Sequence, residues 1–140
     1  KKDYNFKIGK TITLEDGKDI CIFATGPIIK EALIAREILK KKNIKTKVVN
    51  VHTLKPIDHK EILSHSKSKK LLVTIEEHNI IGGLASVISE VLSSEKKTPP
   101  LVKIGIQDQY DKGGNYEFLK RKHNLEGEKI VKKILKKLSS

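Results

Sequence analysis

The hydrophobic positions along the chain form two kinds of pattern, which are short continuous runs and residues at helical spacing. Four short apolar runs rich in β-branched residues have the composition of strands buried on both faces of a sheet. They occupy residues 19–24, 46–51, 71–75 and 101–106. Apolar residues at helical spacing predict helices over about residues 27–42, 58–66, 84–92, 116–122 and 126–138. Strands that alternate with helices predict a three-layer α/β domain with a mainly parallel sheet.

One stretch shows these signals most clearly, because a strand, a polar corner and a helix follow one another. The apolar residues 71–75 lead into Glu76-Glu77-His78, and Gly82-Gly83 precedes the helix. Ligands and partners usually meet parallel sheets at the carboxyl ends of the strands. The polar corner and the glycine pair are therefore the first candidates for a functional site.

The beginning of the chain predicts a linker and then two strands. Residues 1–10 have no periodic pattern, and the chain starts at Lys1 and contains no methionine. We therefore expect them to link residues 11–140 to a missing upstream domain. Residues 11–14 alternate weakly, as an edge strand does, and a turn with Gly17 at positive φ is expected next. Local rules alone would join residues 11–14 and 19–24 in a hairpin.

Three residues are predicted to begin helices. Pro27 lies in a first turn, where its missing N–H costs nothing. Asp58, with Glu61 three positions later, has the pattern of a capping box. Asn115 can cap the short helix over residues 116–122.

The net charge of the chain is +12, but its basic residues are almost all lysines. Among 29 basic residues only Arg36 and Arg121 are arginine, and aromatic residues make up 4% of the sequence. Nucleic-acid recognition draws on arginine forks and aromatic stacking. We therefore interpret the charge as a solvated lysine-rich surface and expect no nucleic-acid partner.

Cys21 is the single cysteine, and it lies within an apolar run. We interpret it as a small buried hydrophobic residue. One cysteine offers neither a disulfide framework nor metal-ligand spacing, so a reducing compartment, the cytoplasm, is expected. No apolar run approaches the length that spans a membrane, and no membrane partner is expected.

Glu76-Glu77-His78 has the residue types of acid–base catalysis or metal binding, but no further ligand lies nearby at the required spacing. Consecutive residues also point in different directions, so a turn or a subunit contact is the favoured interpretation. Thr25-Gly26 and Gly82-Gly83 precede helices, whose free N–H groups can bind an anion. Close packing of strand against helix explains Gly82-Gly83 more simply. Three histidines are expected to be solvated: His59, His65 and His123.

Four blocks in this order resemble the C-terminal domain of transketolase-like enzymes, which depend on thiamine diphosphate. The blocks are residues 19–26, 48–58, 73–84 and 104–108. The resemblance covers about residues 7–138, and the second block is most similar to the C-terminal subunit of split transketolases. Two positions depart from the pattern. Ala85 replaces a glycine, and Lys112-Gly113-Gly114 replaces a loop similar to Gly-x-Ser-Gly.

The resemblance implies a three-layer α/β/α fold whose five-stranded mixed sheet has the order 1-3-2-4-5 and an antiparallel first strand. This order separates the first two strands and is preferred to the hairpin. In this order, the direction in which successive strands are added to the sheet reverses between the strands that end near residues 25 and 76. A ligand crevice or an interface is then expected at this edge, at Thr25, Gly26, Glu76, Glu77, His78, Gly82 and Gly83.

The resemblance also implies a function. The parent would be a transketolase, a transferase of the pentose phosphate pathway that moves a two-carbon ketol unit between sugar phosphates. Thiamine diphosphate and Mg²⁺ or Ca²⁺ would bind other domains, so no catalytic, cofactor or metal residue is assigned to this chain, which alone is expected to be inactive. The expected partners are the thiamine-binding domains or an N-terminal subunit, within a homodimer of the parent.

Three alternative functions remain open. The parent could be a 1-deoxyxylulose-5-phosphate synthase or the β component of a 2-oxoacid dehydrogenase, in which this domain would bind a partner protein. The third alternative, from another class, is a free-standing basic α/β binding domain.

Overall fold

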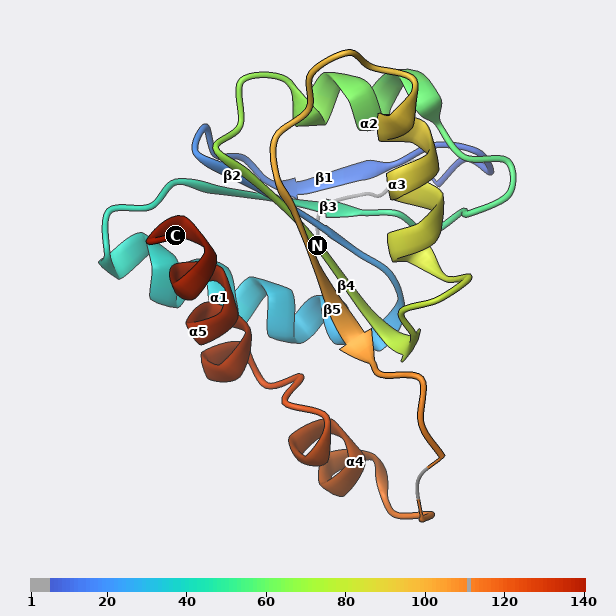
Figure 1. The fold of residues 1–140 in the computed structure, drawn as a ribbon, viewed down its shortest axis with the longest axis vertical. Coiled ribbons are helices and arrows are strands. Elements are labelled where there is room, and N and C mark those ends of the chain that lie inside the picture. Colours follow the sequence, from blue (N-terminus) through green and yellow to red (C-terminus); the bar gives the residue numbers. More distant parts are fainter. Residues whose placement is uncertain (1–5, 111) are drawn as a thin grey trace.

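The computed structural model describes residues 6–110 and 112–140, which form one five-stranded sheet between two layers of helices (Figure 1). The strands are β1 (Ile12–Glu15), β2 (Ile20–Ala24), β3 (Thr46–Asn50), β4 (Leu71–Asn79) and β5 (Leu101–Ile106). Their order is β1-β3-β2-β4-β5. Only β1 is antiparallel to its neighbour. The strand order and the orientation of β1 implied by the resemblance are thus confirmed.

Four helices cover the two faces of the sheet, and they are α1 (Ile29–Lys41), α2 (His59–Ser66), α3 (Leu84–Ser93) and α5 (Gly127–Leu138). A fifth helix, α4 (Tyr116–Lys122), lies beyond the carboxyl ends of β4 and β5 (Figure 1). A short 3₁₀ turn, η1 (Gly26–Ile28), leads into α1. Because side chains alternate across a strand, β2 sends Ile20 and Ile22 toward α1 and α5, and Cys21 and Phe23 toward α2 and α3. The aliphatic core therefore has two parts, one on each face of the sheet.

Several local predictions are confirmed. The Asp58 carboxylate accepts a hydrogen bond from the Glu61 N–H at the start of α2, and Asn115 accepts one from the Phe118 N–H at the start of α4. Cys21 is fully buried. Burial raises the pKa of its thiol to about 12, so it behaves as a small core residue.

The hairpin expected from local rules is wrong, because β1 pairs with β3. Both edges of β2 are occupied by parallel neighbours, β3 and β4, so β1 cannot pair with β2 and lies instead at the free edge of β3. Gly17 also lacks the predicted positive φ. It is needed for another reason: a Cβ there would lie 2.3 Å from the carbonyl carbon of Thr46 and 2.6 Å from the Lys47 nitrogen.

The polar corner is also part of a strand. β4 continues through Glu76-Glu77-His78 to Asn79. Between Ile75 and Asn79 its register with β5 shifts, since four steps along β4 match two along β5. Such a bulge bends a strand and redirects its side chains, and bulges are common next to functional sites.

His65 is buried, so the expectation that it is solvated was wrong. Its ring lies between strand and helix, with Nδ1 3.5 Å from the Lys47 Nζ and Nε2 3.3 Å from the Glu61 carboxylate and 3.4 Å from the Thr11 hydroxyl. Burial first, and then the positive charge of Lys47, lowers the pKa of His65. The attraction of Glu61 opposes this shift only in part.

We expect the free energy of unfolding to fall as the pH drops through the titration of His65. A histidine whose pKa is lowered by folding stabilises the fold fully above the ordinary pKa of about 6.5. This stabilisation is lost as the pH falls through the lowered folded value, by at most about 1.4 kcal/mol per pH unit. Urea unfolding of His65→Gln between about pH 7.5 and 5 should show a flatter pH profile. The exposed His59 gives the control His59→Gln, which should keep the wild-type slope.

Thr74 carries a polar group with no partner in the core. It is fully buried, and its Oγ1 has no hydrogen-bond partner within the described part of the chain. An unpaired buried hydroxyl costs free energy. We expect Thr74→Val to raise the free energy of unfolding by about 1 kcal/mol in urea titrations. Thr46→Val is the control, because Thr46 is also buried but donates to the Ile44 carbonyl. Thr46→Val should not raise the free energy of unfolding.

Candidate functional site at the carboxyl edge of the sheet

The carboxyl ends of β2 and β4 lie side by side, as the strand order requires. Ala24 pairs with Ile75, and the Thr25 N–H donates to the Ile75 carbonyl over 3.4 Å. The structure therefore brings Thr25-Gly26 next to Glu76. From β2 the chain crosses to β3 on one side, whereas β4 and β5 lie on the other. This is the topological switch point at which open α/β sheets bind ligands.

Glu76 is committed to the start of α3. Its side chain is buried, with 1% of the residue exposed. One carboxylate oxygen accepts the Leu84 N–H at 2.7 Å, and the other accepts the Ala85 N–H at 2.9 Å. The positive end of the helix dipole adds to this stabilisation. Glu76 is thus a helix cap supplied by a neighbouring strand.

Gly83 makes room for this carboxylate. A Cβ at Gly83 would lie 2.0 Å from Glu76 Oε2, so any side chain there would have to displace this carboxylate. Gly82 differs, because it has open space around it but a φ of +81°. The two glycines are therefore needed for different reasons, and only Gly83 is needed for close packing against β4.

Glu77 points away from Glu76, toward α4. Glu77 is half-buried and accepts a hydrogen bond from the Tyr116 hydroxyl, and His78 is exposed. This hydrogen bond, followed by burial, raises the pKa of Tyr116 to about 12. Glu76 and Glu77 thus diverge as predicted. They do not form one catalytic or metal-binding group.

A second carboxylate, Glu31 of α1, anchors the C-terminal helices. It is buried and accepts hydrogen bonds from Lys120 Nζ at 2.9 Å and from the Gly127 N–H at 2.8 Å. Lys120 also pairs with Glu117 at 2.8 Å and lies over the Tyr116 ring. The hydrogen bonds that Lys120 donates to Glu117 and Glu31 raise the pKa of Lys120. No local pattern predicts this network, since Glu31 and Lys120 are far apart in the sequence.

The loop after β4 is held by its own polar side chains. The Asn79 amide oxygen accepts the Ile81 N–H, and its nitrogen donates to Asp108 beyond β5, both at 2.8 Å. Ser86 Oγ accepts the Gly82 N–H at 2.8 Å. Asn79 and Asp108 were within the blocks of the resemblance but were given no role.

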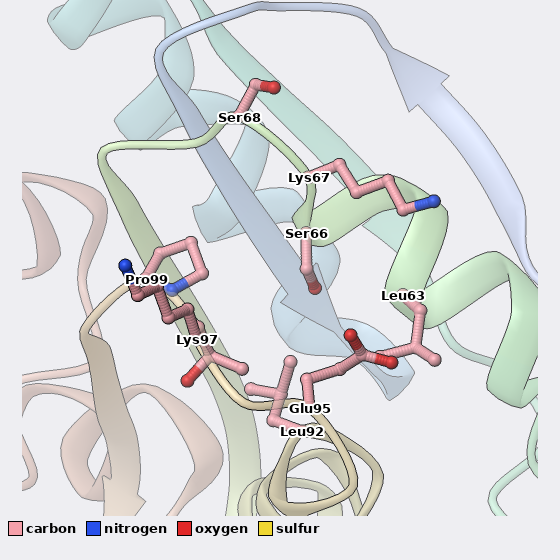
Figure 2. A pocket seen from close by; sticks show the side chains of 9 residues that line it. Leu63, Ser66, Lys67, Ser68, Leu92, Glu95, Lys97 and Pro99 are labelled. Carbon is pink, nitrogen blue, oxygen red and sulfur yellow. The ribbon is translucent and has the colours of Figure 1, made fainter.

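The cavities near the ends of the sheet include one at the carboxyl edge and one at the amino edge. One of about 160 Å³ lies beside Glu77 and is lined by Ile106, Tyr116 and Leu119. The other, of about 280 Å³, lies at the opposite, amino edge between the ends of α2 and α3 (Figure 2). The Ser66 hydroxyl points into it but donates to the Ile62 carbonyl. Neither cavity gathers a set of groups suited to catalysis.

The topology defines the class of protein, a three-layer α/β/α domain with a mixed sheet and an antiparallel edge strand. The family described as "Transketolase, C-terminal domain" matches residues 9–130. The chain belongs to this family.

The chain is similar to proteins that are longer than itself. It is 41% identical over 138 residues to a Methanocaldococcus jannaschii protein assigned as a transketolase C-terminal section, covering 99% of the chain and 43% of that protein. It is 35% identical to 1-deoxy-D-xylulose-5-phosphate synthase of Caldanaerobacter subterraneus, covering 95% and 21%. The solved structure of a split-gene transketolase, an inactive β4 tetramer, matches with a TM-score of 0.89 and 34% identity, covering 97% and 44%. The chain thus spans less than half of each.

Thiamine diphosphate, on which this family of parent enzymes depends, does not fit the residues at the carboxyl edge. A diphosphate at the start of α3 would meet the Glu76 carboxylate on the same N–H groups. Among the residues that the structure describes, no three or more His, Cys, Asp and Glu side chains are grouped to hold a metal ion. We therefore assign the cofactor no ligand at the start of α3.

Within the described ranges, no helix is both long and apolar enough to cross a membrane.

Proposed function

We propose that this chain is the C-terminal domain of a transketolase and that it serves packing and dimer assembly. The parent would transfer a two-carbon ketol unit between sugar phosphates, with thiamine diphosphate and Mg²⁺ or Ca²⁺ bound by other domains or by an N-terminal subunit. The observation that carries the proposal is the match to the split-gene transketolase over nearly the whole chain. The site supports it, because the buried carboxylates Glu76 and Glu31 stabilise helices.

A second candidate parent is a 1-deoxyxylulose-5-phosphate synthase. The 35% identity to such an enzyme over 133 residues favours it. The two parents differ in their donor substrate, a ketose phosphate for the first and pyruvate for the second, so a single pair of assays separates them.

The test uses the full-length parent with thiamine diphosphate and Mg²⁺, beside a matched protein that ends before Lys1 and the 140-residue chain alone. We expect ketol transfer from a ketose phosphate to an aldose phosphate by the full-length parent. We expect a loss of at least about tenfold without this domain, because misassembly weakens the alignment of reacting groups. The chain alone should show no turnover.

Three results would count against the proposal. Turnover of pyruvate in place of ketose phosphate would assign the parent to the second candidate. Full activity and unchanged assembly without this domain would exclude its assembly role. A reaction independent of thiamine diphosphate would exclude both parents.

A further inference from the structure

Residues 6–11, which precede β1, follow a defined path along the domain, and we call them the entry strap. The Lys10 N–H donates to the Lys7 carbonyl over 3.1 Å, which closes a four-residue turn. Gly9 is the third residue of this turn and has a φ of +77°, a value that glycine adopts without strain. A Cβ at Gly9 would lie 3.2 Å from Pro56 Cγ. The strap therefore lies close against the loop that leads from β3 into α2 (Figure 1).

An aromatic contact holds the beginning of the entry strap. The ring of Phe6 lies on the ring of His52, with centroids 4.2 Å apart and planes inclined by 34°. Nδ1 of His52 lies 2.9 Å from the Thr53 hydroxyl, which fixes the imidazole in place. Its Nε2 is buried and has no hydrogen-bond partner among the residues that the structure describes. His52 therefore serves the strap as a flat ring, through an aromatic contact.

Lys10 joins the entry strap to the start of α2. Its Nζ donates to the Asp58 carboxylate at 2.8 Å. The same carboxylate accepts the Glu61 N–H at 3.2 Å and so caps α2. Asp58 is buried, whereas the Lys10 side chain is mostly exposed. One buried carboxylate thus serves both the helix and the strap, and Lys10 supplies its counter-ion.

The helix α2 depends on contacts along its length. It has eight residues, of which Ile62, His65 and Ser66 are buried, and isolated helices of this length are unstable in water. The Thr11 hydroxyl lies 3.4 Å from Nε2 of His65, in the last turn of the helix. The entry strap therefore contacts α2 at both ends, through Lys10 at its cap and through Thr11 at its last turn.

We propose that the entry strap and α2 open and close as one unit, so that the segment before residue 6 controls how firmly α2 is held. A displacement that lifts Phe6 from His52 also withdraws Lys10 from Asp58, and the cap of α2 then loses its counter-ion. In this way a movement at the strap reaches Asp58, 48 residues beyond Lys10. Short cooperative units of this kind open locally while the rest of a domain stays folded. The inference goes beyond the assembly role proposed above and does not depend on the reaction of the parent.

Hydrogen exchange of the 140-residue chain, read by mass spectrometry, measures the opening of α2 directly. The decisive variant is Phe6→Ala, because the ring of Phe6 contacts His52, outside α2. Lys10→Gln removes the counter-ion of the cap. The matched control is Lys7→Gln, since Lys7 is an exposed lysine of the same turn.

We expect amide exchange in residues 59–66 to be about two- to fivefold faster in Phe6→Ala and in Lys10→Gln than in the wild type. Lys7→Gln should leave it unchanged. Exchange in residues 71–75 of β4 is the internal reference and should be the same in all four proteins. It separates a local opening of α2 from a loss of global stability.

Two replacements of His52 test the aromatic contact from the other side. His52→Phe keeps a flat ring beneath Phe6 and removes the buried nitrogen that has no described partner, so exchange in residues 59–66 should stay at the wild-type rate. His52→Ala removes the ring and should accelerate that exchange as much as Phe6→Ala does.

The proposal is overturned if Phe6→Ala leaves exchange in residues 59–66 unchanged, since α2 would then open without the strap. Equal acceleration in residues 71–75 would also overturn it, because the effect would then be global. The same holds if His52→Phe accelerates exchange as much as His52→Ala. None of these results bears on the assembly role, which is judged separately by ketol transfer of the full-length parent with and without this domain.

Discussion

Replacing Glu76 is expected to produce the largest loss of stability of any single side-chain change at the carboxyl edge. The carboxylate accepts two N–H groups of α3 at 2.7 and 2.9 Å in a buried position. Glu76→Ala leaves both donors without a partner and opens a cavity. We expect it to lower the free energy of unfolding by about 3–4 kcal/mol. Urea unfolding followed by circular dichroism gives this value directly.

Glu76→Gln separates the hydrogen bonds from the volume of the side chain. An amide of the same size offers only one oxygen, and its NH₂ group would face the second N–H donor. We expect a loss of about 2 kcal/mol. Glu77→Gln is the control, since Glu77 is half-buried and bonds Tyr116, and it should cost under about 1 kcal/mol. A stability of Glu76→Gln close to that of the wild type would show that the carboxylate does not act as the cap of α3.

The strands and helices could be predicted because their signals are local. The apolar run at 71–75 and the helical spacing after Gly83 depend only on neighbouring residues, and so do the caps at Asp58 and Asn115. Pairing of β1 is not local. It depends on both edges of β2 being occupied by distant segments, and local rules cannot detect that. Only the family resemblance gave the correct order.

The candidate site could be located from the sequence but its chemistry could not. The switch-point rule correctly predicted that Thr25 and Glu76 lie next to each other. Alternation along β4 places Glu76 on the same face as Leu72, the face that α3 covers, but only the folded chain brings its carboxylate to the first N–H groups of α3. One signal was available: a glutamate at the end of a buried strand, eight residues before the first residue of a glycine-led helix.

This arrangement also bears on the predicted crevice. An anion at the start of α3 would have to displace the Glu76 carboxylate. This carboxylate belongs to the chain and therefore loses no translational entropy when it binds the N–H groups. The start of η1, after Thr25, lacks such a side-chain cap. However, η1 is only one turn long. The start of α3 is therefore poorly suited to an anionic small molecule.

Gly83→Ala is expected to lower the free energy of unfolding by about 2–3 kcal/mol, since an added methyl group would overlap the Glu76 carboxylate. The Gly83 backbone is extended, with φ −96° and ψ −151°, so alanine fits its conformation. The cost comes from the contact of 2.0 Å with Glu76 Oε2. It should therefore depend on Glu76.

A double-mutant cycle tests this dependence. In a Glu76→Ala background the clash is absent, so Gly83→Ala should cost under about 1 kcal/mol, a coupling of about 2 kcal/mol. Gly82→Ala is the matched control, because its expected cost of about 1 kcal/mol comes from a φ of +81° in open space. That cost should be the same in both backgrounds. Equal costs of Gly83→Ala with and without Glu76 would mean that the glycine is needed for its backbone and that the carboxylate does not set the spacing between β4 and α3.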